Sequence, residues 1–323
     1  MHDTVTPQSQ TELPAHEAFS SVLAVPAFPR RVTVELTNHC NLNCTMCPRR
    51  YMTMPGGFMS VSLFTRIIDE MAAHPGTVLV PFFRGESLLH PEFTAMIAYA
   101  KPRVGSVQLA TNATLMNRAI AEALIDLEVD FVSFSIDSAD PEIYGRVRRN
   151  ADLGDVLRNI EYLCTMKQER NAKKPQIQVS VVETDDTAEG VEAFIRFWSG
   201  KVDRVRVYRE HSRDGHFGAL GGEREERPSK SRKPCLKPFN DLVVYWNGEV
   251  ALCNHDWNRT APLGNVHDRS IQEIWRSDAY ELQRRAQIGM GEMEDLCRGC
   301  DHWEAYWRKD QLIGVLYEND FQD

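Results

Sequence analysis

The chain has 323 residues and a formal net charge of −9, so it can bury a substantial core in one large domain or two. The acidic balance and the lack of a long basic block argue against nucleic acid as a general partner. No apolar stretch of the sequence approaches the length of a membrane span, and Met1 to His16 is polar and acidic. We therefore expect no transmembrane helix, no signal peptide and a cytoplasmic location. The eight cysteines then indicate metal binding rather than disulfides.

Residues 1–30 contain several prolines and are expected to form an irregular extension. After them, strand-like and helix-like segments alternate. Strands are expected at 32–37, 77–83, 106–111, 131–136, 177–183 and 203–208, and helices at about 61–73, 92–101, 116–127, 153–169 and 188–198. About six successive β-α units predict an α/β fold with a parallel sheet or barrel and helices outside it.

Four of these strands alternate apolar and polar side chains. The apolar members are Val32, Val34, Leu36, Val132, Phe134, Ile136, Ile177, Val179, Val181, Val205 and Val207; the polar ones are Thr33, Glu35, Thr37, Ser133, Ser135, Asp137, Gln178, Ser180, Arg204, Arg206 and Tyr208. Because successive side chains point to opposite faces and helices must cover the apolar face, the polar face is expected to point inward. This predicts an open barrel that holds a polar ligand. The alternative is a sheet with one wetted face.

Three cysteines follow the first strand in Asn38-His-Cys-Asn-Leu-Asn-Cys-Thr-Met-Cys-Pro48. Cys40, Cys44 and Cys47 have the spacing C-x3-C-x2-C. Three thiolates in one short loop can hold three irons of a [4Fe-4S] cube and leave the fourth iron free. A zinc loop is the alternative, but zinc normally takes four ligands and nothing adjacent supplies a fourth.

This loop at a strand end resembles the radical S-adenosylmethionine (radical SAM) superfamily. In that family the free iron binds the methionine part of SAM, and one electron cleaves a C–S bond to give a 5′-deoxyadenosyl radical that removes a hydrogen atom from a substrate. The resemblance implies SAM and a [4Fe-4S] cluster as cofactors and a flavodoxin- or ferredoxin-type electron donor. It also implies a partial (β/α)6 TIM-like barrel over residues 31–209.

Later strand ends resemble further motifs of that family. Phe83-Arg-Gly-Glu86 resembles the Gly-Gly-Glu segment that contacts the SAM amino group, with Arg84 in place of the first glycine. Thr111-Asn-Ala113 resembles a Thr-Asn-Gly near SAM, and Ser133-Phe-Ser-Ile-Asp137 a Ser-x-Ser-Ile-Asp signature. The resemblance implies the following SAM-binding residues: Gly85, Glu86, Thr111, Asn112, Ser135, Asp137 and Arg148, the last in an arginine-containing turn with Arg146 and Arg149.

Residues 210–233 are rich in glycine and charge and lack periodicity, so we expect a linker or a loop near the pocket mouth. A second cysteine set then follows at Cys235, Cys253, Cys297 and Cys300. Its spacing encloses a predicted hairpin, 242–252, with a type I′ turn at Asn247-Gly248, then Gly264-Asn265 and a helix at 270–276. Four cysteines suit either zinc or a cluster.

This order of features resembles the SPASM/twitch domain of radical SAM enzymes, here expected as a small α+β domain over 234–310 followed by a tail, 311–323. The resemblance implies one auxiliary [4Fe-4S] cluster, held by all four cysteines and used for electron transfer. The eighth cysteine, Cys164, falls on the apolar face of a helix and is expected to be a buried small hydrophobe.

The closest family resemblance is to dehydrogenases that oxidise a secondary alcohol of an aminocyclitol or amino sugar to a ketone. It predicts an oxidoreductase of natural-product or antibiotic biosynthesis, acting on a small polar substrate: a sugar, aminocyclitol or sugar acid. Arg206, Tyr208 and Arg209 could orient the substrate or move a proton, or form a salt-bridged wall. Decarboxylation, dehydration and peptide modification remain alternatives, as does a zinc-stapled binding protein. Epimerisation is disfavoured, since no spare cysteine is placed to return a hydrogen.

Overall fold

The computed structural model describes residues 23–209, 232–308 and 311–312. The predicted linker 210–233, except for its last two residues, lies outside the described residues. So do most of the predicted N-terminal extension and most of the predicted tail.

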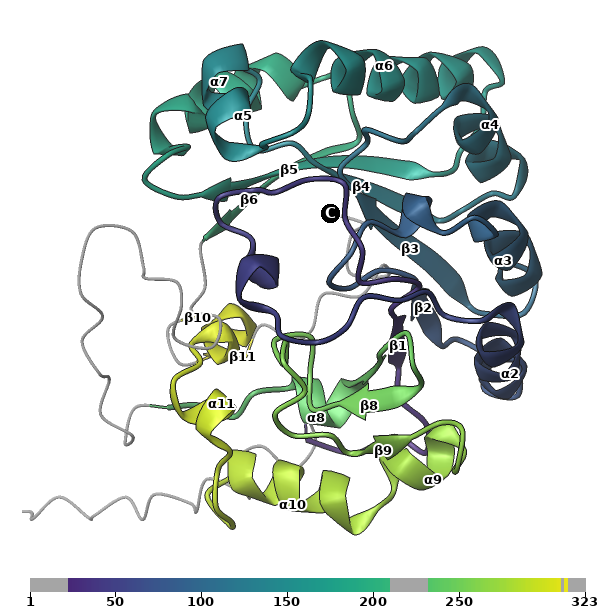
Figure 1. Cartoon of the computed structure of the whole chain (residues 1–323), viewed down its shortest axis with the longest axis vertical. Coiled ribbons are helices and arrows are strands. Elements are labelled where there is room, and N and C mark those ends of the chain that lie inside the picture. The colour runs from purple at the N-terminus through teal and green to yellow at the C-terminus, as the bar shows by residue number, and fades with distance from the viewer. Residues whose placement is uncertain (1–22, 210–231, 309–310, 313–323) are drawn as a thin grey trace, which may run out of the picture.

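Six parallel strands form the sheet expected from the sequence. They are β1 (Arg31–Val34), β2 (Val78–Val80), β3 (Ser106–Thr111), β4 (Phe131–Ser135), β5 (Gln176–Glu183) and β6 (Arg204–Arg209). They neighbour one another in chain order, and β6 does not pair with β1 in the described sheet. The predicted partial, open barrel is therefore confirmed (Figure 1).

Helices cover the outer face of this curved sheet (Figure 1). They are α2 (Val61–Ala72), α3 (Phe93–Ala100), α4 (Arg118–Asp126), α5 (Pro141–Val147), α6 (Leu153–Glu169) and α7 (Val191–Trp198), with short 3-10 turns η1 (Pro48–Tyr51), η2 (Ser87–Leu89) and η3 (Ala188–Gly190). Side chains cap several helix starts: Ser60 for α2, Asn117 for α4 and Asp152 for α6 each accept a backbone N–H of the first turn. All five predicted helices are present. The sequence analysis missed α5, which begins with Asp140 as its cap and Pro141 at its first position.

The two faces of the strands differ as predicted. Val32, Val34 and Leu36 are fully buried in the core that the outer helices share. Burying each such side chain contributes about 1.5–3 kcal/mol relative to leaving it exposed. The opposite parity carries buried polar side chains, among them Glu35 and Gln178. The interior of the half-barrel is therefore polar, which leaves donors and acceptors available for a ligand.

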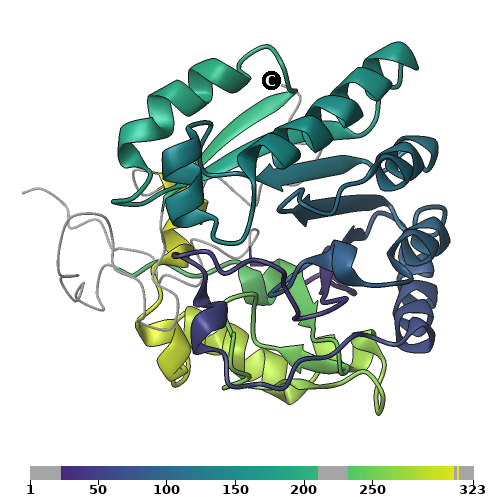
Figure 2. The ribbon, with the colours of Figure 1, turned by 45° about the horizontal axis from the view of Figure 1, so that its top comes forward.

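Three strands of the C-terminal region continue the same sheet. Strand β7 (Asp241–Val244) pairs in parallel with β1. Strand β8 (Glu249–Ala251) pairs antiparallel with β7, and β9 (Gly264–Asn265) pairs antiparallel with β8. Figure 2 shows these strands beside the half-barrel. The predicted boundary near residue 234 stays a prediction, but backbone hydrogen bonds cross it and fix the two parts together.

The predicted hairpin is present, but the predicted type I′ turn is wrong. That turn needs positive φ at both central residues, and here Gly248 has φ +86° while Asn247 does not have positive φ. The turn is longer: Gly248 N–H donates to Tyr245 C=O at 2.9 Å, and Tyr245 N–H donates to Glu249 C=O at 2.8 Å. Gly248 is therefore the one residue of this turn with the positive φ that glycine adopts readily.

The remaining C-terminal elements surround the second cysteine set. They are α8 (Lys237–Asn240), α9 (Ile271–Trp275), α10 (Asp278–Gln287), α11 (Asp295–Arg298), η5 (His302–Tyr306), β10 (Trp307–Arg308) and β11 (Gln311–Leu312). Helix α9 was predicted, and Ser270 and Glu273 form a capping box at its start. Trp275 anchors the chain before β1, because its indole N–H donates to the Pro26 carbonyl at 2.9 Å. Within the described residues, no helix has the length and apolar character that crossing a membrane requires.

Candidate functional site

The first cysteine loop lies beyond the carboxyl end of β1. Backbone hydrogen bonds join it to the end of α5 and the turn that follows α5. Asn43 N–H donates to Arg149 C=O at 3.2 Å, and Thr45 N–H donates to Val147 C=O at 3.0 Å. Within the loop, Cys47 N–H donates to Cys44 C=O at 3.2 Å. The turn between α5 and α6 thus holds this loop over the strand ends, where α/β barrels carry their chemistry.

Cys40 lies beside the end of β3. The Asn112 side chain points its Nδ2 at Cys40 Sγ, 3.9 Å away, and donates to Asn41 Oδ1 at 3.1 Å. On the other side, Arg49 donates to the Cys40 carbonyl at 3.3 Å. The structure thus brings Asn112, predicted to lie near SAM, next to the first predicted iron ligand.

Cys44 lies beside a buried ion pair. Arg148 binds Asp137 Oδ2 through Nε and Nη2, both at 2.5 Å, and its Nη1 lies 3.6 Å from Cys44 Sγ. Burial disfavours the charge of Arg148, yet Asp137 and Cys44 raise its pKa above its usual value. Asp137 has φ +67° and also accepts Val182 N–H at 2.8 Å. Two predicted SAM-binding residues and one predicted iron ligand therefore meet at one point.

Glu86 is buried under the same loop. It accepts Thr111 Oγ1 at 2.8 Å, Asn112 N–H at 2.8 Å and Leu88 N–H at 3.1 Å. Burial raises the pKa of this carboxyl, and these hydrogen bonds oppose the rise. A favourable cationic partner would offset the cost of the buried charge, and the SAM ammonium is the partner expected from the sequence analysis.

Gly85 allows this arrangement because no side chain fits there. A Cβ at this position would lie 2.3 Å from Thr37 O and 2.4 Å from His39 O. The Glu86 N–H donates to that same His39 carbonyl at 2.8 Å. The predicted SAM segment is therefore packed directly against the chain that leads to Cys40.

The thiols of this loop are buried, which affects their protonation. Burial raises the pKa of Cys40 to about 11 and raises that of Cys44 as well. Thiols of this kind stay protonated at neutral pH unless a metal replaces the proton. With Asn112 and Arg148 as nearby donors, the loop fits an anionic iron-sulfur cluster.

The other predicted residues lie along the inner strands. Ser135, at the end of β4, is paired in register with Ser180 of β5. Tyr208 of β6 is 40% exposed, and its hydroxyl lies 3.4 Å from Gln178 Nε2. The guanidinium of Arg206 lies 5.5 Å from the Tyr208 ring. Arg209 ends β6, and its side chain lies outside the described residues. Ser135 stays a prediction of a SAM-binding role, and Arg206, Tyr208 and Arg209 stay predictions of catalytic roles; the last three lie on β6.

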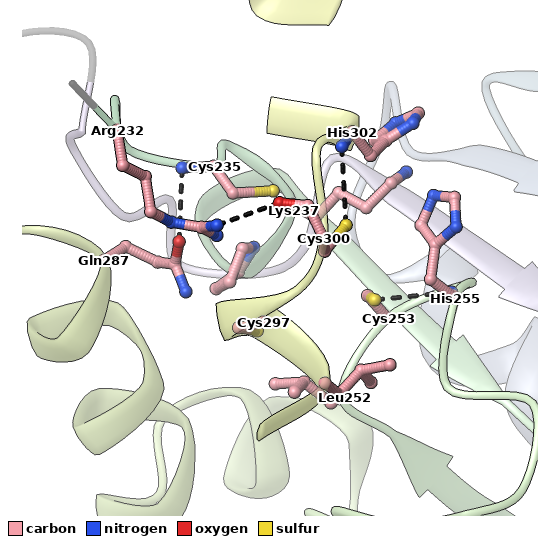
Figure 3. Close-up of a pocket in the computed structure, with 12 residues that line it drawn as sticks. Arg232, Cys235, Lys237, Leu252, Cys253, His255, Gln287, Cys297, Cys300 and His302 are labelled. Carbon is pink, nitrogen blue, oxygen red and sulfur yellow. Dashed lines mark hydrogen bonds between the residues drawn. The ribbon is translucent and has the colours of Figure 1, made fainter. Parts of the chain in front are cut away.

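The second cysteine set lines one pocket, shown in Figure 3. Its lining residues are Cys235, Cys253, Cys297 and Cys300 together with Arg232, Lys237, Pro238, Leu252, His255, Gln287, Leu296 and His302. The His255 N–H donates to Cys253 Sγ at 3.3 Å, and the His302 N–H donates to Cys300 Sγ at 3.4 Å. Burial raises the pKa of Cys235 to about 12 and that of Cys297 to about 11.

The four thiols line one shared pocket, and backbone N–H groups are directed at two of them. Four thiolates can hold either a single zinc ion or a [4Fe-4S] cluster. The number of thiols and the donors beside them therefore fit the predicted auxiliary cluster.

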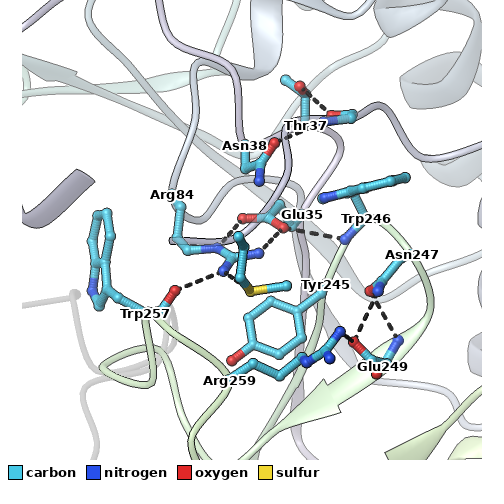
Figure 4. A network of polar contacts seen from close by, with 12 residues as sticks. Glu35, Thr37, Asn38, Arg84, Tyr245, Trp246, Asn247, Glu249, Trp257 and Arg259 are labelled. Atoms are coloured by element: carbon cyan, nitrogen blue, oxygen red, sulfur yellow. Dashed lines mark hydrogen bonds and ion pairs between the residues drawn. The ribbon is translucent and has the colours of Figure 1, made fainter. Parts of the chain in front are cut away.

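The sequence analysis missed a partnership between Glu35 and Arg84, shown in Figure 4. It placed Glu35 on the inner face of β1 and noted Arg84 only as a departure from a glycine. In the structure the two form a fully buried ion pair. Glu35 and Arg84 carry opposite charges and follow the neighbouring strands β1 and β2. This was the signal in the sequence from which the ion pair could have been predicted.

Comparison with known families agrees with this geometry. Residues 34–196 match the family model described as the radical SAM superfamily, and residues 235–301 match an iron-sulfur cluster-binding domain, SPASM. The tungsten-containing aldehyde ferredoxin oxidoreductase cofactor-modifying protein of Pyrococcus furiosus is 26% identical over 76% of this chain and 81% of its own length. The S-adenosyl-L-methionine-dependent 2-deoxy-scyllo-inosamine dehydrogenase of Niallia circulans is 24% identical over 84% of this chain and 92% of its own.

Solved structures share the fold at low identity. BtrN in complex with AdoMet and 2-DOIA matches with a TM-score of 0.56 and 17% identity, covering 88% of this chain and 96% of that one. SuiB of Streptococcus suis, bound to its precursor peptide SuiA, matches with a TM-score of 0.67 and 12% identity, covering 88% of this chain and 72% of that one. Because one was solved with a small molecule and the other with a peptide, the shared fold does not decide the substrate.

Proposed function

Because the chain belongs to the radical SAM superfamily and carries a SPASM domain, we propose that it oxidises a secondary alcohol of an aminocyclitol or sugar to a ketone. The protein uses SAM, a radical SAM [4Fe-4S] cluster and an auxiliary iron-sulfur cluster. When bound, SAM and its cluster supply a 5′-deoxyadenosyl radical, and the auxiliary cluster supplies an electron acceptor. The proposal concerns the substrate class and the fate of the substrate radical.

The observation that carries the proposal is the four-cysteine pocket beside the half-barrel. Four thiolates saturate the irons of a [4Fe-4S] cluster, leaving no open site for substrate and favouring electron transfer. Oxidation of a carbinol to a ketone requires the carbon to lose a hydrogen atom, the hydroxyl to lose a proton, and one further electron to leave. The dehydrogenase of Niallia circulans, related over most of both chains, supports this reaction class.

We assign the residues of the chain in three groups. The proposed ligands of the first cluster are Cys40, Cys44 and Cys47, and those of the auxiliary cluster are Cys235, Cys253, Cys297 and Cys300. The proposed SAM-binding residues are Gly85, Glu86, Thr111, Asn112, Ser135, Asp137 and Arg148. In this assignment Glu86 attracts the SAM ammonium, and Asp137 with Arg148 lies beside the Cys44 thiolate.

On strand β6, Arg206, Tyr208 and Arg209 are proposed to orient the substrate or to accept its hydroxyl proton. The phenol of Tyr208 is exposed to the interior side of the sheet and already contacts Gln178. A phenol paired with an amide can pass a proton or hold a hydroxyl of the substrate by hydrogen bonding. A flavodoxin- or ferredoxin-type protein is the proposed electron donor.

The test is an anaerobic incubation of reconstituted protein with SAM, a reductant and a pool of amino sugars, cyclitols and sugar acids in deuterated buffer. Mass spectrometry follows deoxyadenosine and any altered substrate. A product that lacks two hydrogens supports the proposal. A product of unchanged composition that carries one solvent deuteron means epimerisation and overturns it.

A second candidate is modification of a cofactor of another protein. The observation that favours it is the match to the Pyrococcus furiosus cofactor-modifying protein over 76% of this chain. It predicts that the small-molecule pool stays unchanged while SAM is still cleaved in the presence of a cofactor-containing protein.

A further inference from the structure

The residue that replaces a glycine before the SAM segment lies at the centre of a buried polar network (Figure 4). Arg84 binds both oxygens of Glu35, with Nε to Oε1 and Nη2 to Oε2 at 2.6 Å each. Both side chains are completely buried. This fork-to-fork geometry fixes the direction of the guanidinium as well as its position.

The other side of the guanidinium contacts the C-terminal region. Arg84 Nη1 donates to the Trp257 carbonyl at 2.8 Å, and the guanidinium lies 4.2 Å from the Tyr245 ring centre. Tyr245 in turn donates its hydroxyl proton to the Asp256 carbonyl at 2.6 Å. The segment held in this way, Asp256–Trp257, begins three residues after Cys253.

Glu35 makes the matching contact with the hairpin. Its Oε2 accepts the Trp246 N–H at 3.2 Å, so the turn between β7 and β8 is bound to the end of β1. Arg84 Nη1 also lies 2.9 Å from Met54 Sδ, in the chain that follows Cys47. The pair therefore joins the segments that leave both cysteine sets.

The pair also adjoins the proposed SAM segment. Gly85 and Glu86 follow Arg84 directly, and Gly85 is packed against the backbone of Thr37 and His39 with no room for a side chain. A shift of Arg84 would therefore move Gly85–Glu86 against the chain that leads to Cys40. The ion pair between Arg84 and Glu35 therefore fixes the position of Gly85–Glu86 relative to the chain that leads to Cys40, in addition to any stability that it adds.

Energetics support a role other than stability. A buried ion pair contributes little net stability compared with apolar side chains of similar volume, because both charges must leave water. Loss of one partner is strongly destabilising, whereas replacement of both is often neutral. The position of the pair between two predicted redox centres therefore calls for another explanation.

We propose that Arg84 is a positioning residue that, through Glu35, fixes the Cys253 loop of the auxiliary centre relative to the SAM segment Gly85–Glu86. This inference rests on the proposed function, since it uses the proposed ligand sets. Its consequence is that the distance between the two clusters, and hence the efficiency with which the substrate electron is collected, depends on this ion pair.

The test measures the magnetic interaction between the two clusters by pulsed EPR in reconstituted protein reduced with dithionite, without substrate. The variants are Arg84→Met, Arg84→Lys and the double variant Glu35→Gln/Arg84→Met, which leaves no unpaired buried charge. Lys101→Met is the matched control, because it removes a largely buried ion pair between the end of α3 and Asp130, the residue before β4. Iron content shows that each variant holds both clusters.

We expect wild type and Lys101→Met to share one defined interaction. The double variant should lose it while retaining its iron, and Arg84→Lys should restore it in part. With a turned-over substrate, product per deoxyadenosine should fall roughly tenfold in the double variant, since misplacement of about 1 Å has effects of this order or larger. An unchanged interaction in the double variant overturns the inference alone. A wild-type protein with only one cluster overturns the proposed function and the inference with it.

Discussion

The backbone N–H of Asn112 donates to Oε2 of Glu86 at 2.8 Å and so joins the end of β3 to the loop that follows β2. The Asn112 side chain reaches Cys40 from the same position. Asn112 thus connects the carboxylate of Glu86, which is proposed to bind SAM, with Cys40, a proposed iron ligand.

Glu86→Gln should weaken SAM binding by roughly 10–100-fold, because a hydrogen bond to a charged group contributes about 1.5–3 kcal/mol. Equilibrium binding of SAM to the reconstituted protein measures the effect. The control is Glu92→Gln, which changes an exposed carboxylate at the start of α3. If the Glu86 variant and the wild type bound SAM with equal affinity at equal iron content, Glu86 would not be a SAM-binding residue.

Arg148→Met should make the midpoint potential of the first cluster more negative, by roughly 60 mV for each tenfold change in the redox equilibrium. The added electron loses a neighbouring positive charge, and Asp137 loses its cationic partner. A redox titration followed by EPR measures the potential. Arg146→Met is the control, since that arginine is 53% exposed in its side chain and pairs with Glu189. An unchanged or more positive potential in Arg148→Met would show that its charge does not act on the cluster.

Replacement of Cys235, Cys253, Cys297 and Cys300 by alanine should lower the iron content from about eight to about four per chain, since each cube holds four irons. Deoxyadenosine formation should persist, because the first loop is intact, while ketone formation should stop. Elemental analysis and mass spectrometry check both results. One zinc per chain in the wild type, lost in this variant, would contradict the auxiliary cluster.

Cys164 should react slowly with iodoacetamide in the holoprotein. Burial raises its pKa to about 11, so only about a thousandth of it is thiolate at pH 8, compared with roughly a quarter for an ordinary thiol of pKa about 8.5. Its rate should be roughly 100-fold below that of the unfolded chain and should rise about tenfold per pH unit from pH 7 to 9. Peptide mapping measures the rate of alkylation. A rate for Cys164 equal to that in the unfolded chain would contradict the partial burial of its thiol.

Cys164→Ala should also leave deoxyadenosine and ketone formation unchanged. The residue lies on α6 and packs against the core there, but it is half-buried rather than fully buried as the sequence predicted. Loss of product with retained SAM cleavage would instead give this thiol a role in returning a hydrogen atom.

The sequence predicted the sheet, its inward polar face and both cysteine sets, because each depends on local patterns. Alternation of Val32, Thr33, Val34 and Glu35 determines which face is buried, whatever the rest of the chain does. Cysteine spacing is likewise local. Helix α5 was missed because it is short and its start depends on a single cap, Asp140.

Long-range contacts could not be predicted in this way. The pairing of β7 with β1 joins residues about two hundred positions apart, and no local pattern specifies that partner. The same holds for Arg84, whose role depends on Glu35 and on the Trp257 carbonyl. The prediction of a type I′ turn was wrong because Asn-Gly favours that turn only in a hairpin loop of two residues. Here the hydrogen bonds that close the hairpin enclose a longer loop.

The most direct test of the account is SAM cleavage by a variant in which Cys40, Cys44 and Cys47 are all alanine. The reconstituted protein is incubated anaerobically with SAM and dithionite, and deoxyadenosine is measured by mass spectrometry, with Cys164→Ala as the matched cysteine control. We predict no deoxyadenosine from the triple variant and the wild-type amount from the control. Retained SAM cleavage in the triple variant would contradict the assignment of this loop as the source of the radical.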